Sequence, residues 1–303
     1  MGALGIDMSE IATRKPSASA QGKRAISEHA QEPKVLDKLK EIAKNIRIDI
    51  LRMTNAAGSG HTGGSLGMAD VFAALYFNVL DSSIHTKKPD RERFILSNGH
   101  ICPVWYAALA QKGFIQKKEL MALRKINSRL QGHPSNKDFP LAELATGSLG
   151  QGFCAAVGLA IGYKMDKKKS KIYVSLGDGE LEEGSSWEAL MAAAHYKLDN
   201  LIAFIDRNMV QQAGKTEEMI GIEPLKEKLE AFNWNVIEAN GHDFNEILNA
   251  FDKAEKNTKS PAVIIFHTHM GRGVSFIKDN FEWHGKAPDD EQLKKALKEI
   301  ENG

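Results

Sequence analysis

Short apolar runs alternate with helical patterns along most of this chain, and this alternation limits its possible folds more than any other feature. Most of the runs are apolar throughout, without the polar alternation of a strand that has one solvent-exposed face, so we expect them to be buried on both faces. Strands of this kind separated by helices predict a mostly parallel sheet between two layers of helices, a three-layer α/β/α fold. The predicted strands cover 94–96, 172–176, 201–205, 236–238 and 262–266.

Helical spacing dominates the region before the first strand. Apolar residues recur from Leu39 to Met53, and Gly58 is a natural stop. A second helix is expected from about Gly67 to Leu80, and a charged helix from about Asp289 to Glu301. Residues 1–34 contain no sustained apolar stretch, which predicts a mobile N-terminal tail without a targeting signal. No Pro-rich linker interrupts 35–303, so we expect one domain there.

Composition excludes several functional classes. The chain has 40 basic and 39 acidic residues among 303, a formal charge of +1, which argues against a nucleic-acid partner. With only Cys102 and Cys154, the sequence excludes a disulfide framework and a cysteine-rich zinc site. The most apolar stretch, 154–165, is far shorter than the roughly 20 residues of a membrane-spanning helix. We therefore expect a cytoplasmic protein with no membrane partner.

Glycines cluster at the carboxyl ends of the predicted strands, where ligands bind in open α/β sheets. Gly177 and Gly179 follow the strand at 172–176 and would let a phosphate approach the backbone. Asp178 stands between them and would repel a diphosphate, so a bridging divalent cation is implied. The spacing of the glycines does not fit the dinucleotide-binding fingerprint.

Asn208 ends the next strand along the chain. A right-handed crossover would bring it close to Asp178. A carboxylate, an amide oxygen and a nearby backbone carbonyl are hard ligands that suit Mg²⁺ or Ca²⁺ rather than zinc. Asp178 alone could equally be an ordinary residue at a helix N-terminus, but Asn208 and the flanking glycines favour the metal site.

Two other patterns are interpreted as structural. Gly214-Lys215-Thr216 ends like a nucleotide-binding loop, but Met209 occupies the position of its leading glycine. His267 and His269 have no third metal ligand nearby in the sequence.

The Gly-Asp-Gly segment followed thirty residues later by Asn208 resembles the thiamine diphosphate-binding motif. The wider sequence resembles the transketolase family, whose motifs occur here in the same order and cover roughly 35–300. These motifs are Gly-Ser-Gly-His at 58–61, Ser-Asn-Gly-His at 97–100, Gly-His-Pro at 132–134, Thr-Gly-Ser-Leu-Gly-Gln-Gly at 146–152 and Trp-His-Gly-Lys at 283–286. Thr62 and Asn98 depart from the pattern of some relatives without removing a ligand.

The resemblance implies the thiamine diphosphate-binding fold, known as the PP domain, and a set of site residues. The implied metal ligands are Asp178, Asn208 and the carbonyl of Val210. The implied cofactor contacts are His100, Gly147, Leu149, Gly179, Gln212, His284 and Lys286. The implied catalytic imidazoles are those of His61, His100, His133 and His284, and Glu183 is implied at a subunit contact. Because the ordinary pKa of histidine is near 6.5, we expect either protonation state to be accessible at neutral pH.

Family members usually carry three domains in one longer chain, whereas this one ends after the diphosphate-binding domain. The resemblance therefore implies the N-terminal subunit of a split transketolase, dependent on thiamine diphosphate and Mg²⁺ or Ca²⁺. Its expected partner is a C-terminal subunit with the pyrimidine-binding domain, in an α2β2 assembly that uses sugar or sugar-phosphate substrates. A chain of this kind should expose apolar surface when alone. The alternatives are a subunit of another thiamine diphosphate enzyme, such as 1-deoxyxylulose-5-phosphate synthase, and a non-catalytic cofactor-binding assembly protein.

Overall fold

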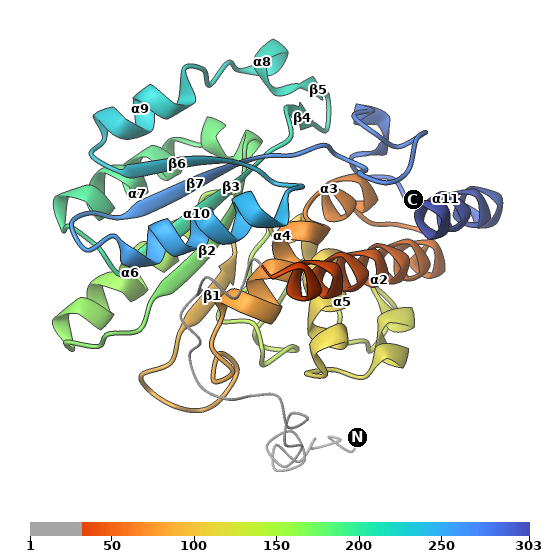
Figure 1. Ribbon diagram of the computed structural model, residues 1–303, viewed down its shortest axis with the longest axis horizontal. Coiled ribbons are helices and arrows are strands. Elements are labelled where there is room, and N and C mark those ends of the chain that lie inside the picture. The colour runs from red at the N-terminus through yellow and green to blue at the C-terminus, as the bar shows by residue number, and fades with distance from the viewer. Residues whose placement is uncertain (1–31) are drawn as a thin grey trace.

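A computed structural model describes residues 32–303, and its centre is a sheet of five parallel strands (Figure 1). Each of the five predicted strands is present. Their spatial order is β1-β2-β3-β7-β6, so the chain passes over β7 before returning to it. The bounds are β1 Arg93–Leu96, β2 Ile172–Gly177, β3 Leu201–Arg207, β6 Asn235–Asn240 and β7 Ala262–His267.

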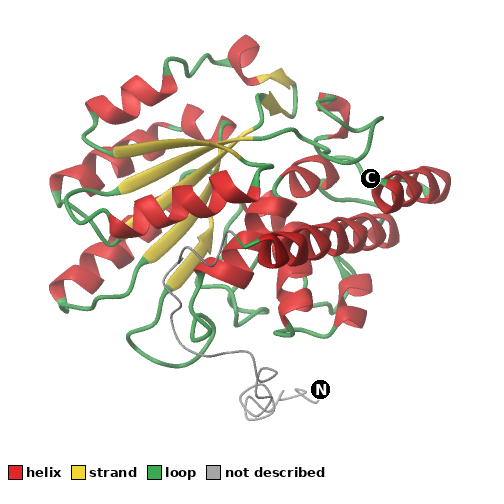
Figure 2. Ribbon diagram, viewed as in Figure 1, coloured by secondary structure: helices red, strands yellow, loops and turns green. Residues whose placement is uncertain are grey.

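Helices cover both faces of this sheet (Figure 2), as the apolar runs predicted. Successive side chains of β3 point to opposite faces: Phe204 belongs to one buried cluster, and Ala203 and Ile205 belong to the other. The first cluster lies under α2 Pro33–Ala57, α4 Ala69–Ala74, α5 Cys102–Lys112 and α10 Phe244–Lys256. The second lies under α6 Gln151–Met165, α7 Gly184–His195 and α9 Leu225–Ala231. The fold is the predicted three-layer α/β/α arrangement.

Helix α2 begins at Pro33 and ends at Gly58, which adopts a left-handed conformation with φ 65°. The tail expected over 1–34 lies outside the described residues except for its last three positions. Between this helix and β1, the second predicted helix differs from the structure in its start.

The helical segment begins at Thr62 rather than Gly67, so the predicted boundary is wrong by five residues. It consists of α3 Thr62–Gly67, then α4, then a π-helical turn over Leu75–Val79, with Met68 between α3 and α4. The glycines that argued against an earlier start serve close packing instead. A Cβ on Gly67 would lie 2.9 Å from the carbonyl oxygen of His269, so only glycine allows this approach.

Short elements lie mostly in the loops at the carboxyl ends of the strands. The hairpin β4 Val210–Gln211 and β5 Gly214–Lys215 was not predicted, and it leads into α8 Thr216–Met219. The charged C-terminal helix is α11 Asp290–Asn302, and it packs on α2, where Lys44 donates to the carbonyl of Glu301 at 2.8 Å. Short 3₁₀ turns cover Gly99–Ile101, Lys117–Ala122, Gly179–Glu182 and Phe281–Trp283.

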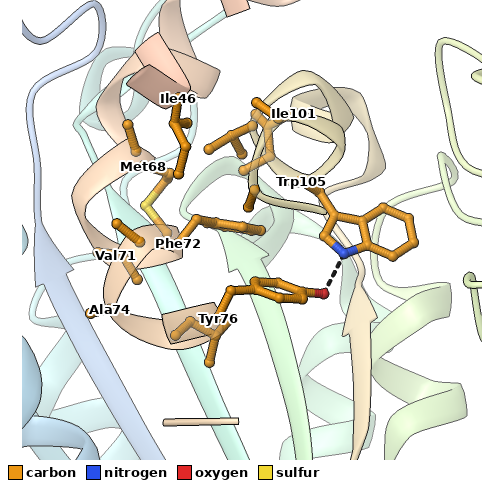
Figure 3. Packing of buried hydrophobic residues seen from close by; sticks show 14 of the residues in the cluster. Ile46, Met68, Val71, Phe72, Ala74, Tyr76, Ile101 and Trp105 are labelled. Carbon is orange, nitrogen blue, oxygen red and sulfur yellow. Dashed lines mark hydrogen bonds between the residues drawn. The ribbon is translucent and has the colours of Figure 1, made fainter. Parts of the chain in front are cut away.

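The packing of α4 against α5 fixes the loop after β1 (Figure 3). Phe72 and Tyr76 stack beside Trp105, whose indole N–H donates to the Tyr76 hydroxyl. Phe94 of β1 stacks on Phe204 of β3 with ring centres 6.2 Å apart. Because α5 directly follows the turn at 99–101, this core holds that turn against the end of the sheet.

Within residues 32–303, no helix combines the length and apolar character needed to cross a membrane.

Candidate active site

The ends of β2 and β3 lie side by side, and they bring the Gly-Asp-Gly turn against the loop after β3. The strands pair in register, with Gly177 beside Asp206. One carboxylate oxygen of Asp178, Oδ2, accepts a hydrogen bond from the backbone N–H of Met209 at 2.8 Å. The other, Oδ1, accepts from the N–H of Gly179 at 2.8 Å. Asp178 therefore contacts the residue between Asn208 and Val210, the other two proposed metal ligands.

The amide of Asn208 is oriented by a buried carboxylate that sequence reasoning missed. Its Nδ2 donates to Oδ2 of Asp206 at 2.8 Å, and its Oδ1 accepts from the N–H of Val210 at 2.9 Å. The second oxygen of Asp206 accepts from the Thr268 hydroxyl on the loop after β7. Burial raises the pKa of Asp206 to about 7, and the nearby charge of Asp178 contributes to the shift.

Arg207 is a second residue that sequence reasoning missed. Its Nη1 lies 3.1 Å from Oδ2 of Asp178, so the chain itself supplies a positive charge beside this carboxylate. Burial raises the pKa of Asp178, while the guanidinium of Arg207 acts in the opposite direction. The expectation that this carboxylate lacks compensation within the chain is therefore corrected.

Glu180 is the third missed residue, and it joins three loops of the site. It is 1% exposed, and its Oε1 accepts from the N–H of Gly150 at 2.8 Å and from the Ser97 hydroxyl. Its Oε2 accepts from the N–H of Gly177 at 3.2 Å. The only sequence signal was a carboxylate directly after the Gly-Asp-Gly turn and before an apolar residue.

Four histidines from four separate loops meet at this end of the sheet. The ring centre of His61 lies 5.0 Å from that of His100, 5.4 Å from that of His284 and 6.3 Å from that of His133. The rings of His100 and His284 are 5.5 Å apart. The backbone N–H of Gly271 donates to the carbonyl of Gly63 at 2.8 Å, which holds the segment carrying His284 over the start of α3.

All four imidazoles are neutral at pH 7 in this chain, contrary to the expectation that both protonation states are accessible. Burial lowers the pKa of His61 to about 3, and the neighbouring His284, Arg124 and His133 lower it further. Burial likewise lowers the pKa of His100, His133 and His284. The physical cause is desolvation, since a buried imidazolium loses its hydration.

The remaining predicted cofactor residues lie around this cluster. Gly147 has φ 147°, and its Cα faces the His133 ring so closely that a Cβ would lie 3.2 Å from that ring. Leu149 lies on the same loop, two residues before α6. Gln212 is exposed in the turn between β4 and β5, and Nζ of Lys286 lies 4.6 Å from the centre of the Trp283 ring.

Two further features complete the region. Glu183 is exposed directly before α7. A depression of about 590 Å³ opens beside His133, and it contains Arg124, a residue that the sequence did not single out. Its lining residues are Ser59, Arg124, Gln131, Gly132, His133, Ser135 and Asp138.

The residues of this site fit a polar ligand with a divalent metal. Within residues 32–303, several buried polar atoms here have no hydrogen-bond partner: the side-chain amide of Asn98, the hydroxyl of Thr146 and Nδ1 of both His61 and His284. Such atoms are costly unless a ligand satisfies them. The same part of the chain contains no group of three or more His, Cys, Asp or Glu side chains suited to a metal. A cation held by Asp178 and Asn208 would thus need further ligands, which diphosphate oxygens can supply.

Residues 38–301 match the family domain described as "Transketolase, thiamine diphosphate binding domain". The chain belongs to the transketolase family. This family match, together with the sheet described above, confirms the thiamine diphosphate-binding fold expected from the resemblance.

Transketolase relatives differ in how much of their length this chain covers. It is 41% identical to one of the named subunits of the apulose-4-phosphate transketolase of Actinobacillus succinogenes, over 88% of this chain and 97% of the relative. It is 40% identical to the 6-deoxy-6-sulfo-D-fructose transketolase subunit SqwG of Clostridium sp. (strain MSTE9) over 87% of this chain and 96% of that one. Human transketolase is 40% identical, but the match covers 90% of this chain and only 44% of the human protein.

Solved transketolase structures show the same relationship. The transketolase of Campylobacter jejuni superposes with a TM-score of 0.81 at 33% identity, over 88% of this chain and 43% of that chain. The transketolase of Leishmania mexicana gives a TM-score of 0.80 at 32% identity, over 87% of this chain and 41% of that chain. This chain thus spans about two fifths of the solved transketolases that it matches.

Proposed function

We propose that this chain is the N-terminal subunit of a two-subunit transketolase. The enzyme would be a transferase that moves a two-carbon ketol unit from a ketose or ketose-phosphate donor to an aldose acceptor. The single observation that carries the proposal is the meeting of His61, His100, His133 and His284 around neighbouring unsatisfied polar groups. The relatives of similar length are named as transketolase subunits, which supports this activity over that of a deoxyxylulose phosphate synthase.

Thiamine diphosphate and Mg²⁺ or Ca²⁺ are the proposed cofactors. Asp178, Asn208 and the carbonyl of Val210 would hold the metal, while His100 and Gly179 would contact the diphosphate. Once bound, the cofactor supplies the carbon nucleophile and the electron sink of the reaction. The residues assigned to its remaining surface are Gly147, Leu149, Gln212, His284 and Lys286.

The imidazoles of this chain would handle protons at substrate oxygens. A neutral imidazole has one donor and one acceptor nitrogen, so it can orient a hydroxyl and then accept its proton. His61 and His284 have buried Nδ1 atoms without a partner in the described structure, which supports their assignment to proton transfer and oxyanion stabilisation. His133 borders the open depression, which supports its assignment to a donor hydroxyl.

A partner protein is part of the proposal. It would carry the pyrimidine-binding domain and form an α2β2 enzyme, with Glu183 at the contact between subunits. Ordinary sugar phosphates are the default substrates, as in the pentose phosphate reactions. The printed names of two relatives extend the candidates to apulose 4-phosphate and a sulfonated fructose. We also propose a cytoplasmic location for the enzyme.

Two substitutions separate cofactor binding from catalysis. We expect Asp178→Ala to abolish thiamine diphosphate binding even at saturating Mg²⁺, as measured by isothermal titration calorimetry. His284→Ala should leave that binding unchanged and lower ketol transfer by about 10²–10⁴-fold after reconstitution with the C-terminal subunit, because a general acid or base is lost. Lys256→Ala, which removes an exposed charge on α10, is the control.

The purified chain without its partner should show no ketol transfer. Undiminished cofactor binding by Asp178→Ala would refute the metal assignment. Unchanged turnover by His284→Ala would refute the catalytic one. Vigorous activity of the unpartnered chain would contradict the split-subunit proposal.

A further inference from the structure

Arg207 is a buried cation with three carboxylate partners next to the proposed metal site. It ends β3, and its side chain is 1% exposed. Nη1 lies 3.1 Å from Oδ2 of Asp178, while Nη2 lies 2.6 Å from Oε1 of Glu217 and 2.7 Å from Oε1 of Glu223. No other part of the proposed mechanism uses this guanidinium.

The three partners come from three different parts of the chain. Asp178 belongs to the turn after β2, Glu217 to α8 and Glu223 to the segment before α9. Glu217 also accepts from the N–H of Ile222 at 3.3 Å. Glu223 also accepts from the N–H of Leu225 at 2.7 Å. Arg207 therefore fastens both ends of the segment 216–224 to the Gly-Asp-Gly turn.

This fastening also holds the residues in between. The segment 208–224 carries Asn208 and Val210, which are proposed metal ligands, and Gln212, which is a proposed cofactor contact. Its short elements are the two-residue strands β4 and β5 and the four-residue helix α8. Elements this short contribute little order by themselves, so the ion pairs of Arg207 are a principal restraint on the segment.

The charge balance supports the same role. Asp178 and Asp206 are both buried, and the charge of Asp178 raises the pKa of Asp206. A guanidinium stays charged at all relevant pH values, so it can offset these acids before any metal arrives. Arg207 bonds to Oδ2 of Asp178, whereas Oδ1 accepts from the backbone N–H of Gly179. A carboxylate oxygen has two lone pairs, so Oδ1 keeps one for a metal.

We propose that Arg207 is a positioning residue that keeps the metal site assembled before metal and cofactor bind. The inference rests on the proposed function only for the identity of the ligands, Asp178 and Asn208. Because the segment 208–224 is already ordered, binding does not bear the entropic cost of ordering it. Loss of Arg207 transfers that cost to the binding step.

The test is hydrogen exchange on the full chain, without ligands and then with Mg²⁺ and thiamine diphosphate. We expect the wild-type segment 208–224 to be protected in both conditions. In Arg207→Met, exchange without ligands should be faster by on the order of tenfold or more and should slow again when both ligands are added. The affinity for thiamine diphosphate at saturating Mg²⁺ should fall by about 10–100-fold, as for other residues that orient metal ligands.

A second variant leaves the arginine in place. Glu217→Gln combined with Glu223→Gln removes two anchors without touching Asp178 or Arg207, and it should accelerate exchange in the same segment. It also decides the question if Arg207→Met does not fold. Arg207→Lys keeps the charge but loses the planar fork, so its exchange should lie between wild type and Arg207→Met. Lys226→Met removes a partly exposed cation on the neighbouring α9 and should change nothing.

Two outcomes overturn the inference. One is unchanged exchange over 208–224 in the double glutamine variant. The other is tighter metal-dependent binding by Arg207→Met, which would mean that the guanidinium competes with the metal. Failure of the wild-type chain to bind thiamine diphosphate would refute the proposed function instead, while the exchange comparison without ligands would still decide the role of Arg207.

Discussion

At the residue scale, burial decides the chemistry that each site residue can perform. The four histidines are neutral because the surrounding chain displaces water from them, and the same burial raises the pKa of Asp206 to about 7. A protein surface would leave these groups close to their ordinary pKa values. The site therefore offers neutral hydrogen-bonding imidazoles rather than imidazolium ions.

This burial has a measurable consequence for stability. The pKa of His61 falls from 6.5 in the unfolded chain to about 3 in the folded one, so the unfolded state binds its proton first. The stability that the neutral ring allows is present above pH 6.5 and is lost as the pH falls toward 3. Between pH 7 and pH 5, wild type should lose about 1 kcal/mol relative to His61→Asn after allowance for partial exposure.

Urea unfolding of both proteins at the two pH values measures this difference. His195→Asn, which changes an exposed histidine on α7, is the control and should follow wild type. Parallel pH dependence of wild type and His61→Asn would contradict the neutral buried state of this ring.

At the element scale, one buried ionic network joins α2, α4 and two loops at the end of the sheet. Arg47 of α2 makes two bonds to Asp70 of α4, at 3.0 and 2.6 Å. Nδ1 of His242 lies 2.9 Å from Asp70, and Nε2 of His242 accepts from the N–H of His269 at 2.9 Å. The helices on this face are thus tied to the loop that leads toward His284.

Breaking this network should be far more costly than breaking a surface ion pair on the same helix. Arg47→Met deprives the buried Asp70 of its guanidinium partner, and we expect it to lower the free energy of unfolding by about 3–5 kcal/mol. Lys40→Met removes an exposed pair with Asp37 and should change it by less than about 0.5 kcal/mol. Chemical denaturation of both variants measures the difference, and equal small effects would show that the network contributes nothing to stability.

At the scale of the whole molecule, the domain exposes large apolar side chains on two segments. Met191 and Tyr196 are 58% and 54% exposed at α7, and Met209, Met219 and Ile220 are 42–59% exposed between β3 and α9. Apolar side chains of this size are usually buried in a stable interface. Both segments adjoin proposed site elements, Glu183 on one and the metal ligands on the other.

We therefore expect Met191→Asp to weaken assembly with the C-terminal subunit. A charge placed in an apolar contact loses its hydration, so the variant should require at least about tenfold higher concentration to form the complex. Size-exclusion chromatography with light scattering measures the assembly. Lys253→Asp, on α10 at the other face of the sheet, is the control, and identical assembly of both variants would exclude α7 from the interface.

Much of the architecture follows from the sequence by itself. Apolar runs at 172–176 and 201–205 are local features, and they predict two-sided burial without knowledge of the partners. Parallel connection then places their carboxyl ends together, which is why Asp178 and the loop after Asn208 could be expected to adjoin. The strand order β3-β7-β6 and the early helix start at Thr62 were not predictable this way, because both depend on contacts between segments distant in the sequence.

The partners and charge states of the site were decided only by the tertiary structure. Glu180, Asp206 and Arg207 resemble ordinary polar residues in the sequence, and their importance comes from burial among groups that the chain brings from elsewhere. The ionisation of His61 depends in the same way on how much water the folded chain removes. Local pattern specifies which segments become strands and helices, whereas desolvation and long-range pairing, which set the electrostatics, exist only once the chain is folded.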